Sequence, residues 1–159
     1  MKLIFNSLKL SSAYCLFITT KIDMKEIRNI KAINLDTRIC FNLALHIFES
    51  ENEDVINLKI IYNNQIFESE GEYYFNVFQK LRDIMLTKKI GLKCYGSMKN
   101  VHPSAMMSTS DLAYILELGK QAKIKDTVCI FDYAEINDFP NTEEQESFYE
   151  LWFNTPKYK

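Results

Sequence analysis

The segment Ile39-Cys40-Phe41-Asn42-Leu43-Ala44-Leu45-His46-Ile47-Phe48 decides the fold class of this chain. Its large apolar side chains recur at every second position, at Phe41, Leu43, Leu45 and Ile47. Successive side chains of a β-strand point to opposite faces of the sheet, so this spacing predicts a buried strand. A buried strand needs partner strands on both sides, so the sequence predicts a β-sheet at the centre of the fold.

More strands are predicted after a short acidic break. Residues 49–54 are Glu-Ser-Glu-Asn-Glu-Asp, which is typical of a turn, and residues 55–62 alternate again as a second strand. Asn63-Asn64 tolerates the left-handed backbone angles of a tight turn, so residues 65–68 are expected to return as a hairpin partner. Residues 27–35 alternate imperfectly, which leaves a strand and a short helix as open alternatives.

A long amphipathic helix is predicted over residues 72–88. Ser69-Glu70-Gly71-Glu72 fits the S-x-x-E capping box, in which the Ser and Glu side chains accept hydrogen bonds from helix N-terminal amides. The apolar stripe that follows has three- and four-residue spacing and comprises Tyr74, Val77, Phe78, Leu81, Ile84 and Met85. This stripe is expected to pack on one face of the sheet.

The last third of the chain is predicted to contain short strands, one loop and a helix. Strands are expected at residues 92–95, 112–118 and 127–131, whereas residues 96–110 show neither a helical nor a strand period. Thr142, followed by Gln145, is expected to cap a helix over 142–153 that packs through Phe148, Leu151 and Trp152. The sequence thus predicts an α+β fold: a mostly antiparallel sheet, a central amphipathic helix on one face, and a C-terminal helix.

Length and composition predict one globular domain over residues 1–159. Hydrophobic residues make up 47% and charged residues 25% of the 159 residues, enough apolar material for one core. Residues 1–23 are expected to form an edge strand or an N-terminal extension, and translation from Met24 is an open alternative. The apolar run near Tyr14 contains polar interruptions and precedes no small-x-small cleavage site, so we expect a cytoplasmic protein without a membrane span.

Several function classes are disfavoured by charge and motif content. A net charge of -2 gives no general attraction to nucleic acid. Four scattered cysteines and two distant histidines do not predict a metal site, so the cysteines are interpreted as reduced core thiols and His46 as a core histidine. Phosphate-binding glycine loops are absent from the sequence, and no cofactor is therefore expected.

Charge is unevenly distributed along the chain. No Lys or Arg occurs between Asp126 and Pro156, and this stretch carries Asp132, Glu135, Asp138, Glu143, Glu144, Glu146 and Glu150. One interpretation is a solvated helix face. The alternative is a docking surface for a basic protein, because complementary charge accelerates association and selects the partner.

The loop at residues 94–108 supports two further interpretations. Cys94 and His102 are the minimum for nucleophilic catalysis, so a small hydrolase-like enzyme is the alternative function. No Asp or Glu in the loop can orient His102, however, and a solvated or carbonyl-bonded imidazole is favoured over a catalytic one. Met98, Met106 and Met107 would form a contact surface or enter the core.

One run in this loop resembles a known family. Cys94-Tyr95-Gly96-Ser97-Met98-Lys99-Asn100-Val101-His102-Pro103-Ser104, together with residues 70–75, 118–122 and 128–132, is similar to a small bacterial family associated with toxin–immunity loci. The similarity covers residues 39–133. It implies an immunity protein that binds and neutralises a cognate toxin domain, often a nuclease, as in contact-dependent growth inhibition. Such a protein acts in the cytoplasm by contact, without a cofactor and without being an enzyme.

Resemblance and charge asymmetry together predict the partner contacts. They are expected at Asp132, Glu135, Asp138, Glu143, Glu144, Glu146, Lys99, His102 and Met106.

Overall fold

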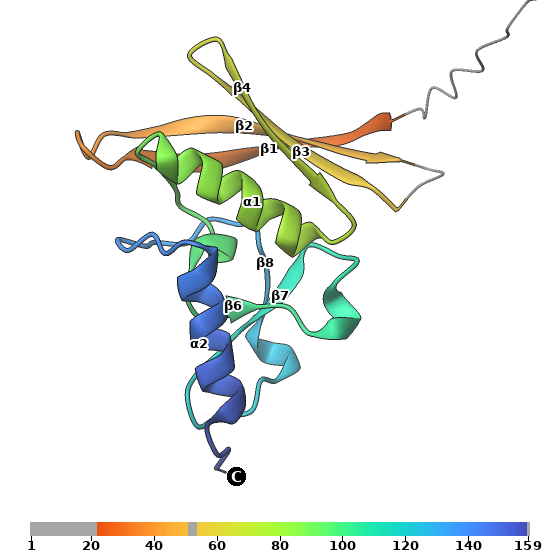
Figure 1. Cartoon of the computed structure of the whole chain (residues 1–159), viewed down its shortest axis with the longest axis vertical. Coiled ribbons are helices and arrows are strands. Elements are labelled where there is room, and N and C mark those ends of the chain that lie inside the picture. Colours follow the sequence, from red (N-terminus) through yellow and green to blue (C-terminus); the bar gives the residue numbers. More distant parts are fainter. Residues whose placement is uncertain (1–21, 51–53, 159) are drawn as a thin grey trace, which may run out of the picture.

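A five-stranded antiparallel sheet with a helix on one face forms the first layer of the molecule. The computed structural model describes residues 22–50 and 54–158. The sheet has the order β4-β3-β2-β1-β5, and the helix α1 (Tyr74–Thr87) crosses it (Figure 1). Its strands are β1 (Ile22–Asn34), β2 (Cys40–Ser50), β3 (Ile56–Tyr62), β4 (Gln65–Gly71) and β5 (Ile90–Leu92). We call these strands and α1 the sheet layer.

Residues 93–158 pack below α1 as a second, smaller unit (Figure 1). Its three-stranded antiparallel sheet has the order β6-β7-β8, and the helix α2 (Thr142–Asn154) runs beside it (Figure 1). The strands are β6 (Val101–His102), β7 (Leu112–Ile115) and β8 (Thr127–Cys129). We call these strands and α2 the C-terminal region. The α+β class, the α1 position and the C-terminal helix are confirmed, although the strands are divided between two sheets.

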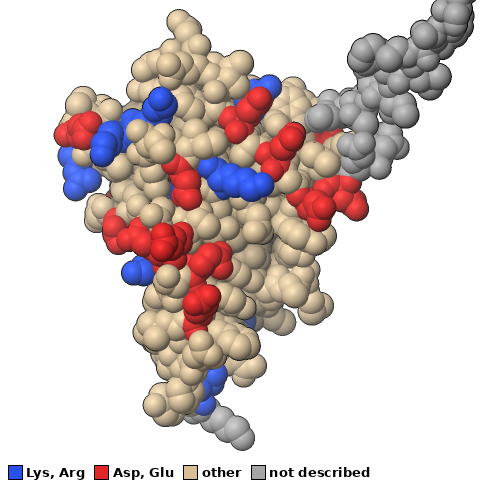
Figure 2. All heavy atoms as spheres, viewed as in Figure 1, with Lys and Arg blue, Asp and Glu red and all other residues tan. Residues whose placement is uncertain are grey.

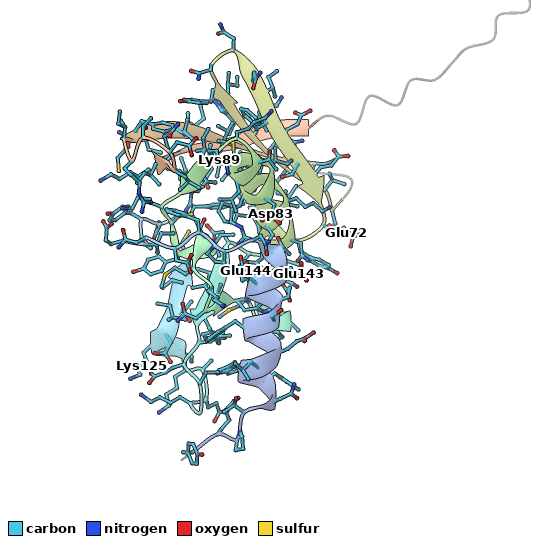
Figure 3. The ribbon with its side chains drawn as sticks, turned by 60° about the vertical axis from the view of Figure 1, so that its left-hand side comes forward. Glu72, Asp83, Lys89, Lys125, Glu143 and Glu144 are labelled. Atoms are coloured by element: carbon cyan, nitrogen blue, oxygen red, sulfur yellow. The ribbon has the colours of Figure 1, made fainter. Side chains whose placement is uncertain are left out.

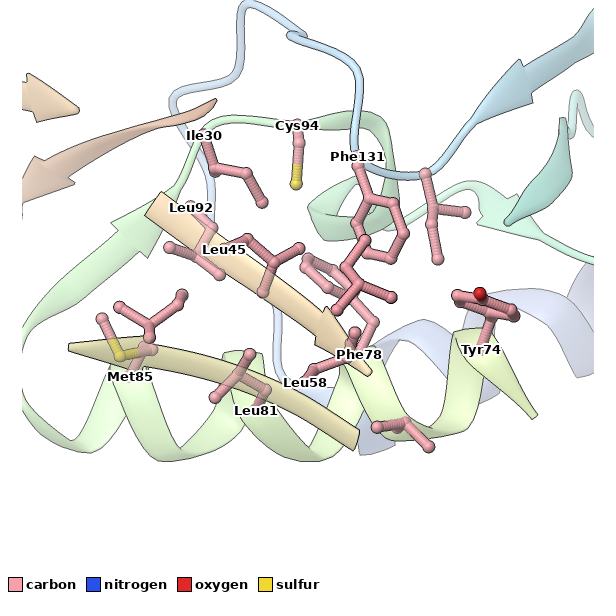
Figure 4. Close-up of a cluster of buried hydrophobic side chains, with 14 of the residues drawn as sticks. Ile30, Leu45, Leu58, Tyr74, Phe78, Leu81, Met85, Leu92, Cys94 and Phe131 are labelled. Carbon is pink, nitrogen blue, oxygen red and sulfur yellow. The ribbon is translucent and has the colours of Figure 1, made fainter. Parts of the chain in front are cut away.

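The core lies between the large sheet and α1. Leu43, Leu45 and Ile47 of β2 are buried on the face toward α1, which confirms the strand predicted from their two-residue spacing. Figure 4 shows Leu45 and Leu58 pointing toward Phe78 and Leu81 of the helix. Residues 27–35, for which strand and helix were both open, belong mainly to β1, because they pair with β2 through Ile33↔Cys40.

The predicted hairpin is confirmed. Asn63 and Asn64 have φ values of 50 and 60°, and Tyr62 pairs with Gln65 across the turn. Both positions are left-handed, which matches the right-handed twist of the flanking strands and explains why asparagine suits them.

The predicted capping box at Ser69 is wrong. Ser69 lies within β4 opposite Leu58, and its hydroxyl donates to the Val77 carbonyl at 2.8 Å. The helix begins at Tyr74, after Tyr73, whose side chain makes no capping hydrogen bond. β4 pairs with β3 as far as Gly71, so residues 69–71 belong to the sheet. They cannot also form the helix N-terminus that the S-x-x-E motif predicts.

The α1 stripe is confirmed except at one end. Tyr74, Val77, Phe78, Leu81 and Met85 are buried, whereas Ile84 is 37% exposed. Two polar side chains in the same helix, Gln79 and Arg82, are also buried, which the apolar pattern did not predict. Arg82 is four residues after Phe78 and three before Met85, so its position within the stripe does indicate burial.

The C-terminal helix is capped one residue earlier than predicted. Asn141, not Thr142, is the cap, and Glu144 returns a hydrogen bond to the Asn141 amide. The prediction of an apolar packing face also fails at Leu151, which is 55% exposed, while Tyr149 is half-buried. Gln145, expected to take part in the cap, is instead the one residue of α2 that is fully buried.

Not all predicted core thiols and histidines are in the core. Cys94 is buried, but Cys40 is exposed and Cys129 is partly exposed. His46 lies on the sheet face away from α1 and stacks on Phe48, because it alternates with the buried Leu45 and Ile47. Cys15 and the strands expected before residue 22 lie outside the described residues.

The helices of the described ranges are not membrane-spanning candidates. Neither their length nor their hydropathy is sufficient for a helix to cross a bilayer.

Candidate protein-binding surface

An acidic hollow lies where α1 and α2 meet. It has a volume of about 620 Å³ and is lined by Asp83, Leu86, Thr87, Asn141, Thr142 and Glu143. Figure 3 shows Asp83 of α1 close to Glu143 and Glu144 in the first turn of α2. Acidic side chains also follow one another down the molecular face that carries both helices (Figure 2). None of the six lining residues is basic, but Asp83 pairs with Arg82 behind the wall, so within the described part of the chain Glu143 carries the unpaired negative charge of the lining.

A buried arginine holds the two sides of the acidic hollow together. Arg82 is 1% exposed. Its Nη2 donates to Asp83 Oδ1 at 3.0 Å and to Thr142 Oγ1 at 3.0 Å, which joins the two helices. Burial lowers the pKa of Arg82, but Asp83 opposes that effect by stabilising the cation. The Asp83 carboxylate is thereby fixed on the wall of the hollow.

Gln145 connects α2 to the loop that follows β5. Its Nε2 lies 3.1 Å from the Gly96 carbonyl oxygen, 2.7 Å from that of Met98 and 3.2 Å from that of Val101. Its Oε1 accepts a hydrogen bond from Arg82 at 2.7 Å. The Gly96 carbonyl also accepts a hydrogen bond from Arg82 Nη1 at 3.3 Å and the Met98 carbonyl accepts the Val101 amide at 3.3 Å, so Gln145 adds to the pairing of these carbonyls. Sequence reasoning missed this role because glutamine in a helix is usually a surface residue.

The N-terminus of α2 faces the hollow with two of its first-turn amides hydrogen-bonded to side chains. The Thr142 amide donates to Asp83 Oδ2 at 3.2 Å, and the Glu144 amide donates to Asn141 Oδ1 at 2.9 Å. Carboxylates near this end also interact favourably with the helix dipole. Glu144 is therefore held by its contacts with Asn141, while the exposed Glu143 adds negative charge at the favourable end of the helix dipole.

The predicted acidic contacts differ in how free their charges are. Among residues 22–50 and 54–158, no Lys, Arg or His forms an ion pair with the predicted contacts Asp132, Asp138, Glu143 and Glu144. Glu135 differs because it pairs with Lys93 and accepts a hydrogen bond from Tyr133. These two hydrogen bonds lower the pKa of Glu135. The available negative charge is therefore concentrated near α2 and in the segment before it.

Glu146 and His102 face each other between α2 and the loop. Glu146 accepts from Gln79 Nε2 at 2.9 Å, and its Oε2 is 3.4 Å from His102 Nε2. The His102 ring stacks on Tyr149 at a centroid distance of 3.8 Å. His102 Nδ1 is 2.9 Å from the Pro103 carbonyl oxygen, as expected for a carbonyl-bonded imidazole. Both side chains are thus engaged in contacts within the chain.

The loop at residues 94–108 places one methionine against the core and another on the surface, so each of the two predicted alternatives applies to part of it. Val101 is fully buried and Met98 packs against the core, whereas Met106 is 95% exposed. Lys99 is also exposed. Met106 and Lys99 are therefore accessible to a partner, while the side chains near Val101 fix the loop.

The run that carries the family resemblance is a packing element in this fold. Cys94 and Ser97 are fully buried, and a Cβ on Gly96 would lie 2.7 Å from the Phe78 ring. Burial raises the pKa of Cys94 to about 11, so its sulfur is a neutral thiol at neutral pH. Because the thiolate is the nucleophilic form, this position does not activate Cys94.

Possible metal ligands do not gather in the described part of the chain. Within residues 22–50 and 54–158, no group of three His, Cys, Asp or Glu side chains is arranged to hold a metal ion.

An exposed apolar surface on the large sheet was not predicted. Ile27, Ile61 and Ile66 are 53%, 54% and 61% exposed on the face away from α1. Ile61 alternates with the buried Leu58 and Ile60 within β3, and this alternation is the sequence signal for its outward position.

Comparisons with protein families and with curated proteins found no relative of this chain. No protein-family model matches the chain, and no curated protein matches it. Family membership and function therefore remain predictions based on the chain itself.

Proposed function

We propose that this protein binds a cognate bacterial toxin domain and neutralises it by covering a basic surface. The observation that carries the proposal is the acidic hollow between α1 and α2, whose lining contains two carboxylates and no basic residue. Opposite charge on a partner would raise the association rate and select that partner over others.

The hollow suits a Lys or Arg side chain from the toxin. Leu86 offers an apolar surface to the methylene stem, while Asp83 and Glu143 can accept hydrogen bonds from the cationic end. The Asp83 oxygens have further lone pairs beyond those used by Arg82 and Thr142. An arginine would gain most, because its planar guanidinium can bind two acceptors at once.

Rigidity supports the same proposal. Arg82 and Gln145 fix both helices before a partner arrives, so binding loses little conformational freedom on this side. Enzymes that act on nucleic acids carry basic surfaces, because they neutralise phosphates. A toxin nuclease is thus the kind of protein whose active surface an acidic inhibitor can cover.

The proposal is tested by calorimetric titration with toxin domains encoded by genes that adjoin the gene for this protein. Thr87→Lys/Glu143→Lys puts positive charge into the hollow and leaves the Asn141–Glu144 cap intact. We expect the affinity to fall about 100-fold or more, since a like-charge contact replaces an attractive one. Gln65→Lys/Glu70→Lys is the matched control, because it makes the same total charge change on β4.

Three outcomes would contradict the proposal. Failure of the unaltered protein to bind or inhibit the neighbouring toxin would reject the immunity function. Unchanged affinity of the hollow variant would reject this surface. Equal losses in both variants would show that net charge, not the hollow, determines binding.

A further inference from the structure

A second hollow lies in the C-terminal region and differs in chemistry from the acidic one. Its volume is about 660 Å³, and it is lined by the chain between β7 and β8 together with Tyr158. Its apolar walls include Ile115, Leu118 and Val128, while Lys123 and Lys125 also line it. Figure 3 shows Lys125 away from Glu143 and Glu144. We call this hollow the lysine pocket.

The C-terminal residues hold the wall of the lysine pocket in place. The Tyr158 amide donates to the Gly119 carbonyl at 2.8 Å, and the Trp152 indole donates to the Lys120 carbonyl at 3.0 Å. Gly119 has a φ of 77°, and a Cβ at this position would lie 3.2 Å from the Tyr158 ring. Glycine suits this backbone conformation, and a larger residue would require the Tyr158 ring to shift slightly.

Two ammonium groups of the lysine pocket are available to a ligand. Lys120 is paired with Glu117 at 2.7 Å. Within residues 22–50 and 54–158, Lys123 and Lys125 form no ion pair with a carboxylate. Asp126 also lines the pocket, but its Oδ2 accepts the backbone amide of Lys123 at 3.0 Å. The lining therefore contains more positive than negative charge.

The tyrosine gives the lysine pocket an exposed aromatic surface. Tyr158 is 79% exposed although its backbone is fixed to Gly119, and Leu118 beside it is 45% exposed. A flat apolar group can bury both surfaces, because aromatic rings stack favourably at van der Waals distance. An apolar body alone would leave the lysines without an acidic partner.

We propose that the lysine pocket binds a small organic anion with a flat apolar body. The body would lie against Leu118, Val128 and Tyr158, and its carboxylate, phosphate or sulfonate would contact Lys123 and Lys125. The volume is within the range of about 300–1,000 Å³ that is usual for small-molecule sites. This site is independent of the acidic hollow and of the proposed toxin partner.

The test uses 8-anilinonaphthalene-1-sulfonate, an aromatic anion whose fluorescence rises in apolar surroundings. We expect saturable binding to the folded full chain. Lys123→Ala/Lys125→Ala should weaken that binding about tenfold, because two charge contacts are lost. N-phenyl-1-naphthylamine has the same rings without the sulfonate, so its binding should be weaker and insensitive to the lysine change.

Further variants separate the lysine pocket from other surfaces. Tyr158→Ala alters an exposed side chain near the chain end and should weaken the probe without unfolding the protein, as checked by circular dichroism. Lys88→Ala/Lys99→Ala removes two exposed lysines elsewhere and should leave the affinity unchanged. The proposal is overturned if the probe does not bind saturably, if the lysine pair has no effect, or if Ile61→Ala/Ile66→Ala alone abolishes binding.

Discussion

The sheet layer and the C-terminal region are stabilised by different kinds of contact. In the sheet layer, aliphatic side chains of three adjacent strands meet the apolar stripe of α1, and many are completely buried. In the C-terminal region, α2 fully buries only Gln145, and hydrogen bonds and stacked rings such as His102–Tyr149 provide much of its attachment. Both hollows involve the C-terminal region, where polar contacts position side chains without enclosing them.

The two units are nevertheless joined by aromatic side chains. Phe131, which follows β8, contacts Tyr74 and Phe78 of α1 edge to face, with ring centroids 6.2 and 5.8 Å apart. The sheet layer and the C-terminal region therefore belong to one connected structure and are expected to differ in local stability. Substitutions in each unit can measure that difference in stability.

The largest effect is expected from the sheet layer. Leu58 is fully buried, so Leu58→Ala should lower the free energy of unfolding by about 2–5 kcal/mol through lost burial and a cavity. Ile61→Ala on the same strand is the control, because Ile61 is 54% exposed and should cost about 1 kcal/mol or less. Urea unfolding followed by circular dichroism measures both values. Similar losses for the two variants would contradict the assignment of the inner face.

An intermediate and more local effect is expected from the C-terminal region. Gln145→Leu keeps the side-chain volume but removes one hydrogen-bond partner each from Arg82 and from the Gly96, Met98 and Val101 carbonyls. Each buried group left unpaired costs about 1–3 kcal/mol, partly relieved by local opening. Hydrogen exchange should become faster in α2 and in residues 96–101 and remain slow in β2 and β3. Equal acceleration in both units would show that they unfold together.

The smallest effect is a pH dependence in the sheet layer. Partial burial alone would raise the pKa of Glu49, but hydrogen bonds from Lys25 and Tyr74 outweigh it and lower that pKa below 4.5. Stabilisation by Glu49 is therefore present above pH 4.5 and is lost as the pH falls through the lowered pKa. The side chain is 38% exposed, so the contribution should be below about 1 kcal/mol.

Glu49→Gln provides the measurement for this pH effect. The difference in unfolding free energy between the unaltered protein and the variant should be present at pH 7 and become smaller in acid. A difference that stays constant from pH 7 to pH 3 would contradict the role of the Glu49 carboxylate. The comparison would also show how little an exposed polar contact contributes relative to Gln145.

The sequence was most informative where one face of an element is buried. Two-residue spacing located β2 and β3, and the three- and four-residue spacing located α1, because burial repeats with the geometry of each element. Local motifs were less reliable. The capping box predicted at Ser69 does not form, because β4 pairs with β3 as far as Gly71. The cap of α2 is Asn141 and not the predicted Thr142.

The candidate site was only partly predictable. Acidic residues near α2 were identified from the absence of Lys and Arg, but Asp83 comes from α1, 60 residues before Glu143. Only the folded chain brings these two carboxylates to one hollow. The position of Arg82 within the α1 stripe indicates its burial, but its partners and the burial of Gln145 depend on contacts between distant segments, which no local pattern contains.

The position of β4 at the end of the large sheet affects how copies of this protein meet. Within the described residues, β4 pairs with β3 alone, so its other side offers backbone amides and carbonyls to any extended chain. Two copies joined along these sides would place Glu70 and Glu68 of each chain on adjacent strands; Glu68 pairs with Lys59 at 3.5 Å, so repulsion between the Glu70 carboxylates would be the main opposition to that union. Glu70 is thus suited to keep concentrated protein from self-association, a role separate from any binding partner.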